Sequence, residues 1–310
     1  MANQDQRALA KVITMIENDH PKKLSIMSDL NARKKNAHYI GITGSPGAGK
    51  SSVVDHFLTL LREKNKKIAV IAVDPTSPFS GGALLGDRVR MQKHFTDENV
   101  FIRSMATRGS IGGLARATKD AIRACDAYGF DYILIETVGV GQSELDIMKV
   151  ADTTAVVLTP NSGDIMQVFK AGIMEIADLF ILNKSDLPGV NKLKSQLEDL
   201  IHIAGHKGLE PPIIETTSSE KPSGFDNLYE AFNKHWTYLE ETKTGKEKRQ
   251  EQLQYEVYEL IQEELWKEIK QSIEQDEAKQ RSLSEHGDPY QIAEQWLKEW
   301  RRNRKGDSGG

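Results

Sequence analysis

The order of apolar and polar residues between His38 and Leu239 is that of repeated strand–helix units. Short, continuously apolar runs are separated by amphipathic stretches. Strands covered by helices on both faces show this pattern, and strands joined through helices form right-handed crossovers in a parallel sheet. The pattern therefore predicts an α/β fold with a mainly parallel sheet flanked by helices. The predicted strands are residues 38–43, 67–73, 100–103, 132–138, 154–159, 179–182 and 213–216.

Two flanking stretches differ from this central part. Residues 1–37 are polar and helical in pattern, and residues 240–310 are rich in Glu, Lys, Gln and Arg. We therefore predict an N-terminal helical extension (1–37), a central sheet domain (38–239) and a C-terminal helical arm with a tail (240–310). The arm carries an apolar stripe with spacings of three and four, formed by Leu253, Val257, Leu260, Ile261, Leu265, Ile269 and Ile273.

The stripe on the arm has two interpretations. The helix could pack back on the sheet domain, or it could supply an interface between two copies of the chain. We favour the second, because so long an arm has few other partners in a chain of this size.

Composition argues against a nucleic-acid-binding, membrane-spanning or secreted protein. The chain has 310 residues, of which 38% are hydrophobic and 28% charged, and its net charge is −4. A mildly acidic balance argues against nucleic acid as a partner. We expect no membrane span and no secretion signal, because the apolar runs are short and the N-terminus has no apolar core. The single cysteine, Cys125, suits a reducing compartment, so we expect a cytoplasmic protein.

A phosphate-binding loop follows the first predicted strand. The glycines let successive N–H groups point at a phosphate, and the following helix adds its positive N-terminal end. Lys50 would bring a charge to the β- and γ-phosphates, and the Ser51 hydroxyl would be a hard ligand for Mg²⁺. The motif G-x-x-x-x-G-K-[ST], with one further serine, consists of Gly44, Ser45, Pro46, Gly47, Ala48, Gly49, Lys50, Ser51 and Ser52.

A second motif, Asn183-Lys184-Ser185-Asp186, follows the sixth predicted strand. The Asp186 carboxylate could accept hydrogen bonds from N1 and the exocyclic amine of guanine, which adenine cannot offer in the same way. Asn183 could brace neighbouring loops, and the Lys184 stem could cover the base. This arrangement predicts GTP rather than ATP as the nucleotide. The loop after the seventh strand could add contacts to the guanine oxygen through Thr217, Ser218 and Ser219.

Acidic residues at strand ends are the candidate metal ligands. Glu136 ends a buried strand, Asp74 ends the second strand, and Asp87 follows in a loop rich in glycine and proline. Any of the three could reach Mg²⁺ or its waters, and Arg90 could stabilise the transferring charge. The catalytic base stays open among these three carboxylates and the phosphate of the substrate itself.

Further loop residues could respond to the γ-phosphate. Gly139 belongs to a flexible backbone after Glu136 whose N–H groups can sense that phosphate, and Gln142 could orient water.

Together these motifs resemble the MeaB/ArgK group of P-loop GTPases. The resemblance covers roughly Leu9 to Trp300. It rests on G-S-P-G-A-G-K-S-S, D-P-T-S-P-F-S-G-G-A-L-L-G-D-R-V-R-M, R-G-S-I-G-G-L, E-T-V-G-V-G-Q-S-E and N-K-S-D. The group includes GTPase chaperones of adenosylcobalamin-dependent methylmalonyl-CoA mutase. Older descriptions called its members LAO/AO transport kinases.

The resemblance implies a SIMIBI-class GTPase domain and a dimerisation arm at the C-terminus, hence a homodimer. It implies Mg²⁺ held through Ser51 and assisted by Asp74, Asp87 and Glu136. It also implies a mobile loop in which Gln167 and Lys170 respond to nucleotide and partner. In the family, GTP binding and slow hydrolysis gate cobalamin delivery to the mutase and protect that enzyme. The acyl-CoA mutase served could equally be of the isobutyryl-CoA type.

Two alternatives belong to other functional classes. The chain could be a kinase that phosphorylates a periplasmic amino-acid-binding protein, but no acceptor-substrate pocket is evident in the sequence. It could also be a GTPase that delivers nickel, but its 8 histidines are scattered and Cys125 has no cysteine partner.

Overall fold

The computed structural model describes residues 6–74, 88–106, 116–137, 146–160, 176–205, 208–219, 221–276, 279 and 288–306. The chain forms two compact units, residues 1–249 and residues 250–310, which are described separately. The predicted boundaries after residues 37 and 239 stay a prediction. Among the described residues, no helix is long and apolar enough to cross a membrane.

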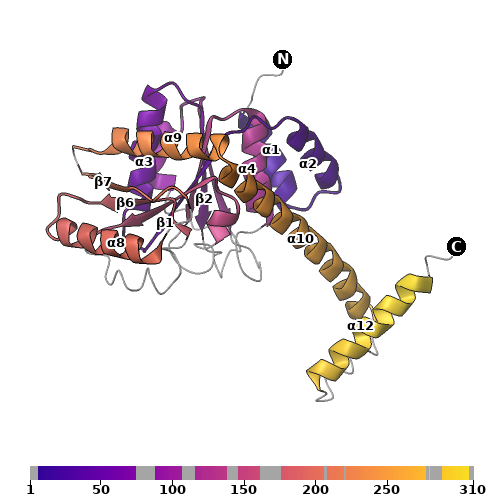
Figure 1. Cartoon of the computed structure of the whole chain (residues 1–310). Coiled ribbons are helices and arrows are strands. Elements are labelled where there is room, and N and C mark those ends of the chain that lie inside the picture. The colour runs from indigo at the N-terminus through magenta and orange to yellow at the C-terminus, as the bar shows by residue number, and fades with distance from the viewer. Residues whose placement is uncertain are drawn as a thin grey trace. The chain divides into compact units, whose positions relative to one another are not determined.

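A seven-stranded sheet forms the centre of the first unit (Figure 1). Its strand order is β3-β2-β4-β1-β5-β6-β7, and every neighbouring pair is parallel. This confirms the predicted parallel α/β fold. The strands are β1 (His38–Gly44), β2 (Ile68–Asp74), β3 (Val100–Ala106), β4 (Tyr132–Thr137), β5 (Thr153–Leu158), β6 (Leu179–Asn183) and β7 (Ile213–Thr216).

The third strand is longer than its apolar run predicts. The apolar run stops at Arg103, but β3 continues to Ala106. As the edge strand, β3 has one side open to other elements. Arg103 points to the face of the sheet that α1 (Gln6–Glu17) covers, as Phe101 and Met105 do. Its guanidinium forms an ion pair there with Glu17, so a charged residue is accommodated within the strand.

Helices cover both faces of the sheet. Successive strand residues point to opposite faces, so a continuously apolar strand has apolar side chains to bury on each of them. Ile40 and Ile42 of β1 pack against α3 (Lys50–Glu63) and α9 (Phe225–Glu241). On the other face, Tyr39 shares a cluster with residues of α1, α2 (Lys23–Ala32) and α4 (Arg116–Tyr128).

The rest of the second face is covered by α8 (Val190–Ala204), whose Leu197 and Ile201 meet Val156 and Leu158 of β5. In α1, the apolar side chains of Leu9, Ile13 and Ile16 are fully buried. Two short 3₁₀ helices, η1 (Arg88–His94) and η2 (Ile147–Lys149), complete the described elements of this unit.

The second unit consists of most of α10 (Lys243–Glu274) and of α12 (Pro289–Gly306). Within it, Lys279 lies 3.6 Å from Glu299 of α12. Several residues of the predicted stripe are exposed: Leu253 by 61%, Val257 by 42%, Leu260 by 40% and Ile261 by 52%. The stripe is therefore an apolar surface of the single chain.

Candidate functional site

The predicted site residues gather at the carboxyl ends of the parallel strands, where open α/β sheets bind their ligands. Lys50 and Ser51 begin α3 directly after the loop that leaves β1. Glu136 is the residue before the end of β4, which lies beside β1, and Asn183 ends β6. Motifs far apart in the sequence thus share one edge of the sheet.

The backbone of the phosphate loop requires glycine at two positions. Gly44 has a φ of +136°, and a Cβ there would lie 2.2 Å from the backbone oxygen of Val157 in β5. Gly49 has a φ of +90°, and a Cβ there would lie 2.3 Å from Nδ2 of Asn183. Since only glycine adopts such angles without strain and leaves this space free, both residues fix the curl of the loop.

The ammonium group of Lys50 lies within the loop. Its Nζ donates hydrogen bonds to the backbone oxygens of Gly44, at 2.7 Å, and Ser45, at 3.2 Å. The residue is only 6% exposed. A positive charge is therefore held at the concave side of a glycine-rich turn, where it can attract the phosphates of a nucleotide.

Two oxygen donors meet between α3 and β4. The Ser51 hydroxyl donates a 2.6 Å hydrogen bond to Oε1 of Glu136, and both residues are buried. One residue further along β4, the Thr137 hydroxyl donates to Oγ1 of Thr43 at 3.0 Å. These contacts join the end of β4 to the start of the phosphate loop.

The chemistry of this pair suits Mg²⁺. The metal takes oxygen ligands and usually keeps several waters, binding through one or two protein groups together with substrate phosphates. The described residues contain no group of three or more His, Cys, Asp or Glu that could hold a metal ion. Ser51 and Glu136 thus fit a metal that is shared with a nucleotide.

Asn183 connects the second motif to the phosphate loop. Its Nδ2 donates to the backbone oxygen of Ala48 at 2.9 Å. Its Oδ1 accepts from the hydroxyls of Thr216, at 3.3 Å, and Ser218, at 2.9 Å. The predicted bracing contact of Asn183 is therefore present, and it joins the phosphate loop to the end of β7 and the loop that follows β7.

Lys184 makes a similar connection. Its Nζ donates to the backbone oxygen of Gly47 at 3.0 Å. Its φ of +57° is uncommon outside glycine and turns the chain sharply after β6. The stem of Lys184 therefore crosses from the second motif to the phosphate loop.

The loop after β7 is tied to the same motif. The Ser185 and Thr217 hydroxyls lie 2.8 Å apart, and the Ser185 N–H donates to the backbone oxygen of Thr216 at 3.1 Å. Ser185 and Thr216 were not predicted as site residues. Asp186 and Ser219 are exposed, so the Asp186 carboxylate is accessible to a ligand.

The other predicted residues lie on β2, η1 and α3 or outside the described ranges. Asp74 ends β2, which pairs with β4 up to Val73 and Thr137, and Arg90 belongs to η1. Ser52 is in the first turn of α3. The remaining predicted residues lie outside the described ranges: Asp87, Gly139, Gln142, Gln167 and Lys170.

A cavity of about 530 Å³ lies elsewhere in the unit. Its lining includes Lys67, Asn99 and Phe130, which stand before or near the amino ends of β2, β3 and β4. It is therefore at the opposite edge of the sheet from the phosphate loop.

Comparisons with known proteins agree with a nucleotide site at the carboxyl ends of the strands. A protein of Pyrococcus horikoshii that carries the name of a GTPase is 46% identical over 295 residues, covering 94% of this chain and 93% of that protein. The GTPase ArgK of Escherichia coli is 35% identical over 258 residues, covering 80% and 78%. The crystal structure of an LAO/AO transport system kinase has the same fold, with a TM-score of 0.71, 24% identity, and coverage of 96% of this chain and 94% of that one.

The parallel sheet, the phosphate loop and these relatives define the chain as a P-loop GTPase, an enzyme that hydrolyses GTP to GDP and phosphate. The sequence model of one family, described as methylmalonyl Co-A mutase-associated GTPase MeaB, matches residues 9–274. The chain belongs to this family.

Proposed function

We propose that this GTPase is a chaperone that gates cofactor loading of an adenosylcobalamin-dependent acyl-CoA mutase of the methylmalonyl-CoA type and protects that mutase. The observation that carries the proposal is the family match over residues 9–274, because the family is described by its association with methylmalonyl-CoA mutase. The match includes the sheet and α10, so it extends beyond the nucleotide site. We place this activity in the cytoplasm.

In this proposal, guanine nucleotide binds along the carboxyl edge of the sheet. The N–H groups of the loop from Gly44 to Ser52 cradle the phosphates, and Lys50 adds its charge. Asp186 accepts hydrogen bonds from guanine, while Asn183 and Lys184 hold the base-recognition loop against Ala48 and Gly47. Thr217, Ser218 and Ser219 close the other side of the base.

Hydrolysis then depends on charge placed around the γ-phosphate. Ser51 and Glu136 would hold Mg²⁺, with help from Asp74 and Asp87. When bound, the metal neutralises charge that develops on the phosphates. Glu136 keeps the Ser51 hydroxyl oriented through its 2.6 Å hydrogen bond.

Other side chains would act on the transferred group and report its presence. Arg90 stabilises charge on that group. Gly139, Gln142, Gln167 and Lys170 are the residues we propose to change arrangement between GTP and GDP, and so to signal the nucleotide state to the mutase.

The apolar stripe of α10 supports a homodimer as the working form. Leu253 and Ile261 are more than half exposed in the single chain, and Trp266 of the same helix is 54% exposed. A second copy would remove these side chains from water, which is favourable. Removing residues 250–310 is expected to give a monomer by light scattering, whereas a persisting dimer would place the interface elsewhere.

The chaperone role is tested by capture of a methylmalonyl-CoA mutase with the full chain loaded with a non-hydrolysable GTP analogue or with GDP. We expect capture that depends on the nucleotide, and GTP hydrolysis that rises when the mutase is present. Lys50→Ala, which should lose nucleotide, serves as the control. Equal capture in all states would contradict gating. Phosphate transfer to an amino-acid-binding protein instead of water would favour a kinase.

A further inference from the structure

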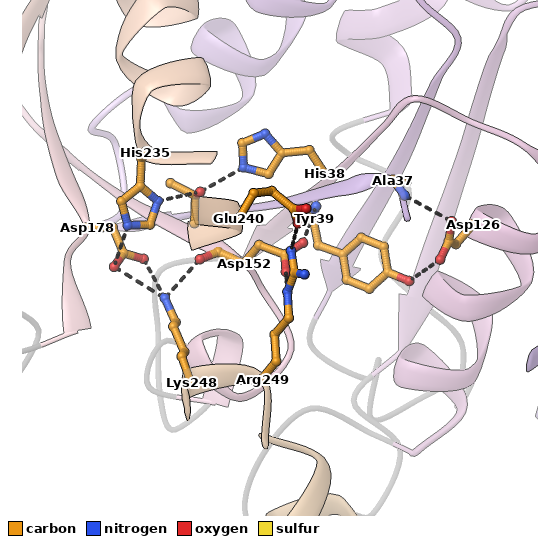
Figure 2. Close-up of polar contacts among 11 residues, drawn as sticks. Ala37, His38, Tyr39, Asp126, Asp152, Asp178, His235, Glu240, Lys248 and Arg249 are labelled. Atoms are coloured by element: carbon orange, nitrogen blue, oxygen red, sulfur yellow. Dashed lines mark hydrogen bonds and ion pairs between the residues drawn. The ribbon is translucent and has the colours of Figure 1, made fainter. Parts of the chain in front are cut away.

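A cluster of polar side chains lies at the amino ends of β1, β5 and β6, opposite the nucleotide edge (Figure 2). We call it the root cluster, because it includes the part of α10 that belongs to the first unit. The root cluster consists of His38, Asp152, Thr153, Asp178, His235, Lys248 and Arg249. The proposed nucleotide chemistry uses none of these residues.

Part of the root cluster is a directed chain of hydrogen bonds. Nε2 of His235 lies 3.3 Å from Oδ1 of Asp178, which places a proton on Nε2. When His235 is neutral, its Nδ1 therefore accepts from the Thr153 hydroxyl at 2.8 Å. The same hydroxyl then accepts from Nε2 of His38 at 2.7 Å. This chain connects β1, β5 and α9 to the residue before β6.

The order Thr153–His235–Asp178 is that of a catalytic triad, but it is closed to substrates. Thr153 is fully buried, and His235 is only 5% exposed. A nucleophilic hydroxyl must reach its substrate, so this arrangement cannot act as a hydrolase site.

Lys248 connects α10 to this chain. Its Nζ donates to Oδ2 of Asp178 at 3.0 Å and to the backbone oxygen of Asp152 at 2.9 Å. Burial alone would raise the pKa of Asp178, but the hydrogen bond from His235 and the charge of Lys248 hold that pKa below its ordinary value. Asp178 is therefore a carboxylate at neutral pH, and the contact with Lys248 is an ion pair.

Arg249 adds a second set of contacts from the same turn of α10. Its guanidinium donates to Glu240 of α9 and lies 3.8 Å from Oδ1 of Asp152. It also stacks over the ring of Trp236, 5.2 Å from the ring centre. Two consecutive residues of α10 thus hold both α9 and the residues that precede β5 and β6.

The strands that leave the root cluster lead to the nucleotide edge. Asp178 immediately precedes β6, and β6 ends at Asn183 of the base-recognition loop. At roughly 3.3 Å per residue, the five steps from Asp178 to Asn183 separate the two by about 17 Å. The Asp178 carboxylate also accepts from the backbone N–H of Thr154 in β5 at 2.8 Å, so it engages both strands. Hydrogen bonds to β5 and β7 make β6 a stiff connection.

We propose that Lys248 and Asp178 form a latch that couples the root of α10 to guanine-nucleotide binding through β6. The proposal rests on the proposed role of the Asn183–Asp186 loop in holding the base. Coupling of two binding events is reciprocal, so nucleotide must stabilise the latch as much as the latch stabilises bound nucleotide.

The test combines hydrogen exchange with nucleotide release in the full chain. Saturating GDP is expected to slow amide exchange in residues 243–249 of the wild type. Lys248→Met is expected to remove this effect and to speed GDP release roughly two- to tenfold. The matched control is Lys243→Met, in the same helix, because the Lys243 side chain is 89% exposed and its ammonium group lies 3.2 Å from Glu247, within the helix itself. Lys248→Arg, which keeps the charge, should restore much of the effect.

Each outcome decides the proposal. If GDP leaves exchange in residues 243–249 unchanged in the wild type, there is no coupling and the proposal is wrong, even if the variant fails to fold. If Lys248→Met loosens these residues but leaves GDP release unchanged, the contact only holds the helix in place, and the proposal is equally wrong. Failure of the wild type to bind GDP would instead contradict the proposed nucleotide site.

Discussion

The Ser51 hydroxyl and the Glu136 carboxylate are joined by a 2.6 Å hydrogen bond between residues 85 positions apart in the chain. Ser51 is the second residue of the helix after the phosphate loop, and Glu136 is next to the last residue of the neighbouring strand. The contact brings a hydroxyl and a carboxylate together where a metal and the γ-phosphate are proposed to bind. It therefore identifies the pair whose alteration should affect hydrolysis more than folding.

Glu136→Gln should keep the fold, because the amide oxygen can still accept from Ser51, but it removes a negative charge beside the proposed metal. We expect the rate of GTP hydrolysis to fall about 10- to 100-fold and the Mg²⁺ requirement to rise. Hydrolysis measured against Mg²⁺ concentration checks this. Glu63→Gln is the control, because Glu63 is exposed in the last turn of the same helix as Ser51. Equal rates in the two variants would exclude Glu136 from the metal site.

The close approach of Gly49 and Asn183 leads to a second prediction. Gly49→Ala and Gly47→Ala both place a side chain at positive φ, +90° and +78°, but only the first meets a neighbour, Nδ2 of Asn183 at 2.3 Å. Gly49→Ala should therefore lower the free energy of unfolding roughly 1–3 kcal/mol more than Gly47→Ala. Urea unfolding of the nucleotide-free chain measures the difference. If both variants lose the same free energy of unfolding, the positive φ accounts for the whole loss and the contact with Asn183 adds nothing.

The sequence was sufficient to predict the sheet, because strands covered on both faces are continuously apolar. It also located the phosphate loop and the N-K-S-D loop, since fixed spacings place these at strand ends. The predicted third strand was too short, because the charged Arg103 ends the apolar run. In the structure Glu17 of α1 pairs with Arg103, and the strand continues.

Contacts between polar groups distant in sequence could not be predicted. The hydrogen bond between Thr43 and Thr137 joins residues 94 positions apart, and that between His38 and Thr153 joins residues 115 apart. Periodicity shows which face of a strand is buried, but it does not show which buried hydroxyl meets which. The root cluster was missed for this reason, since its members have no common motif.

The exposed carboxylate of Asp186 should determine the choice of base. Asp186→Asn replaces it with an amide that can donate to the additional oxygen of xanthine. We expect GDP to bind about 10- to 100-fold more weakly, while xanthosine diphosphate gains relative to GDP. Calorimetric titration of both nucleotides measures the ratio, with the exposed Asp199→Asn in α8 as the control. An unchanged ratio would remove Asp186 from base recognition.

Buried His38 should make stability depend on pH. Burial is the main cause that holds the pKa of His38 well below its ordinary value of 6.5; the interaction with His235 acts in the same direction, and Asp178 opposes the shift. The folded chain therefore keeps His38 neutral, while the unfolded chain takes up a proton as the pH falls through 6.5. Stability contributed by neutral His38 is fully present above pH 6.5 and is lost below it, by at most about 1.4 kcal/mol per pH unit.

The variant His38→Gln isolates this contribution, because its amide can still donate to Thr153 but does not titrate. Asp152 acts in the opposite sense: burial raises its pKa to about 6, so its protonation favours the folded state as the pH falls from that value. Since Asp152 is present in both proteins, the difference between them should report His38. Urea unfolding between pH 7.5 and pH 5.5 is expected to give a steeper loss of stability in the wild type than in the variant. Parallel curves would mean that His38 is protonated in the folded chain as readily as in the unfolded one.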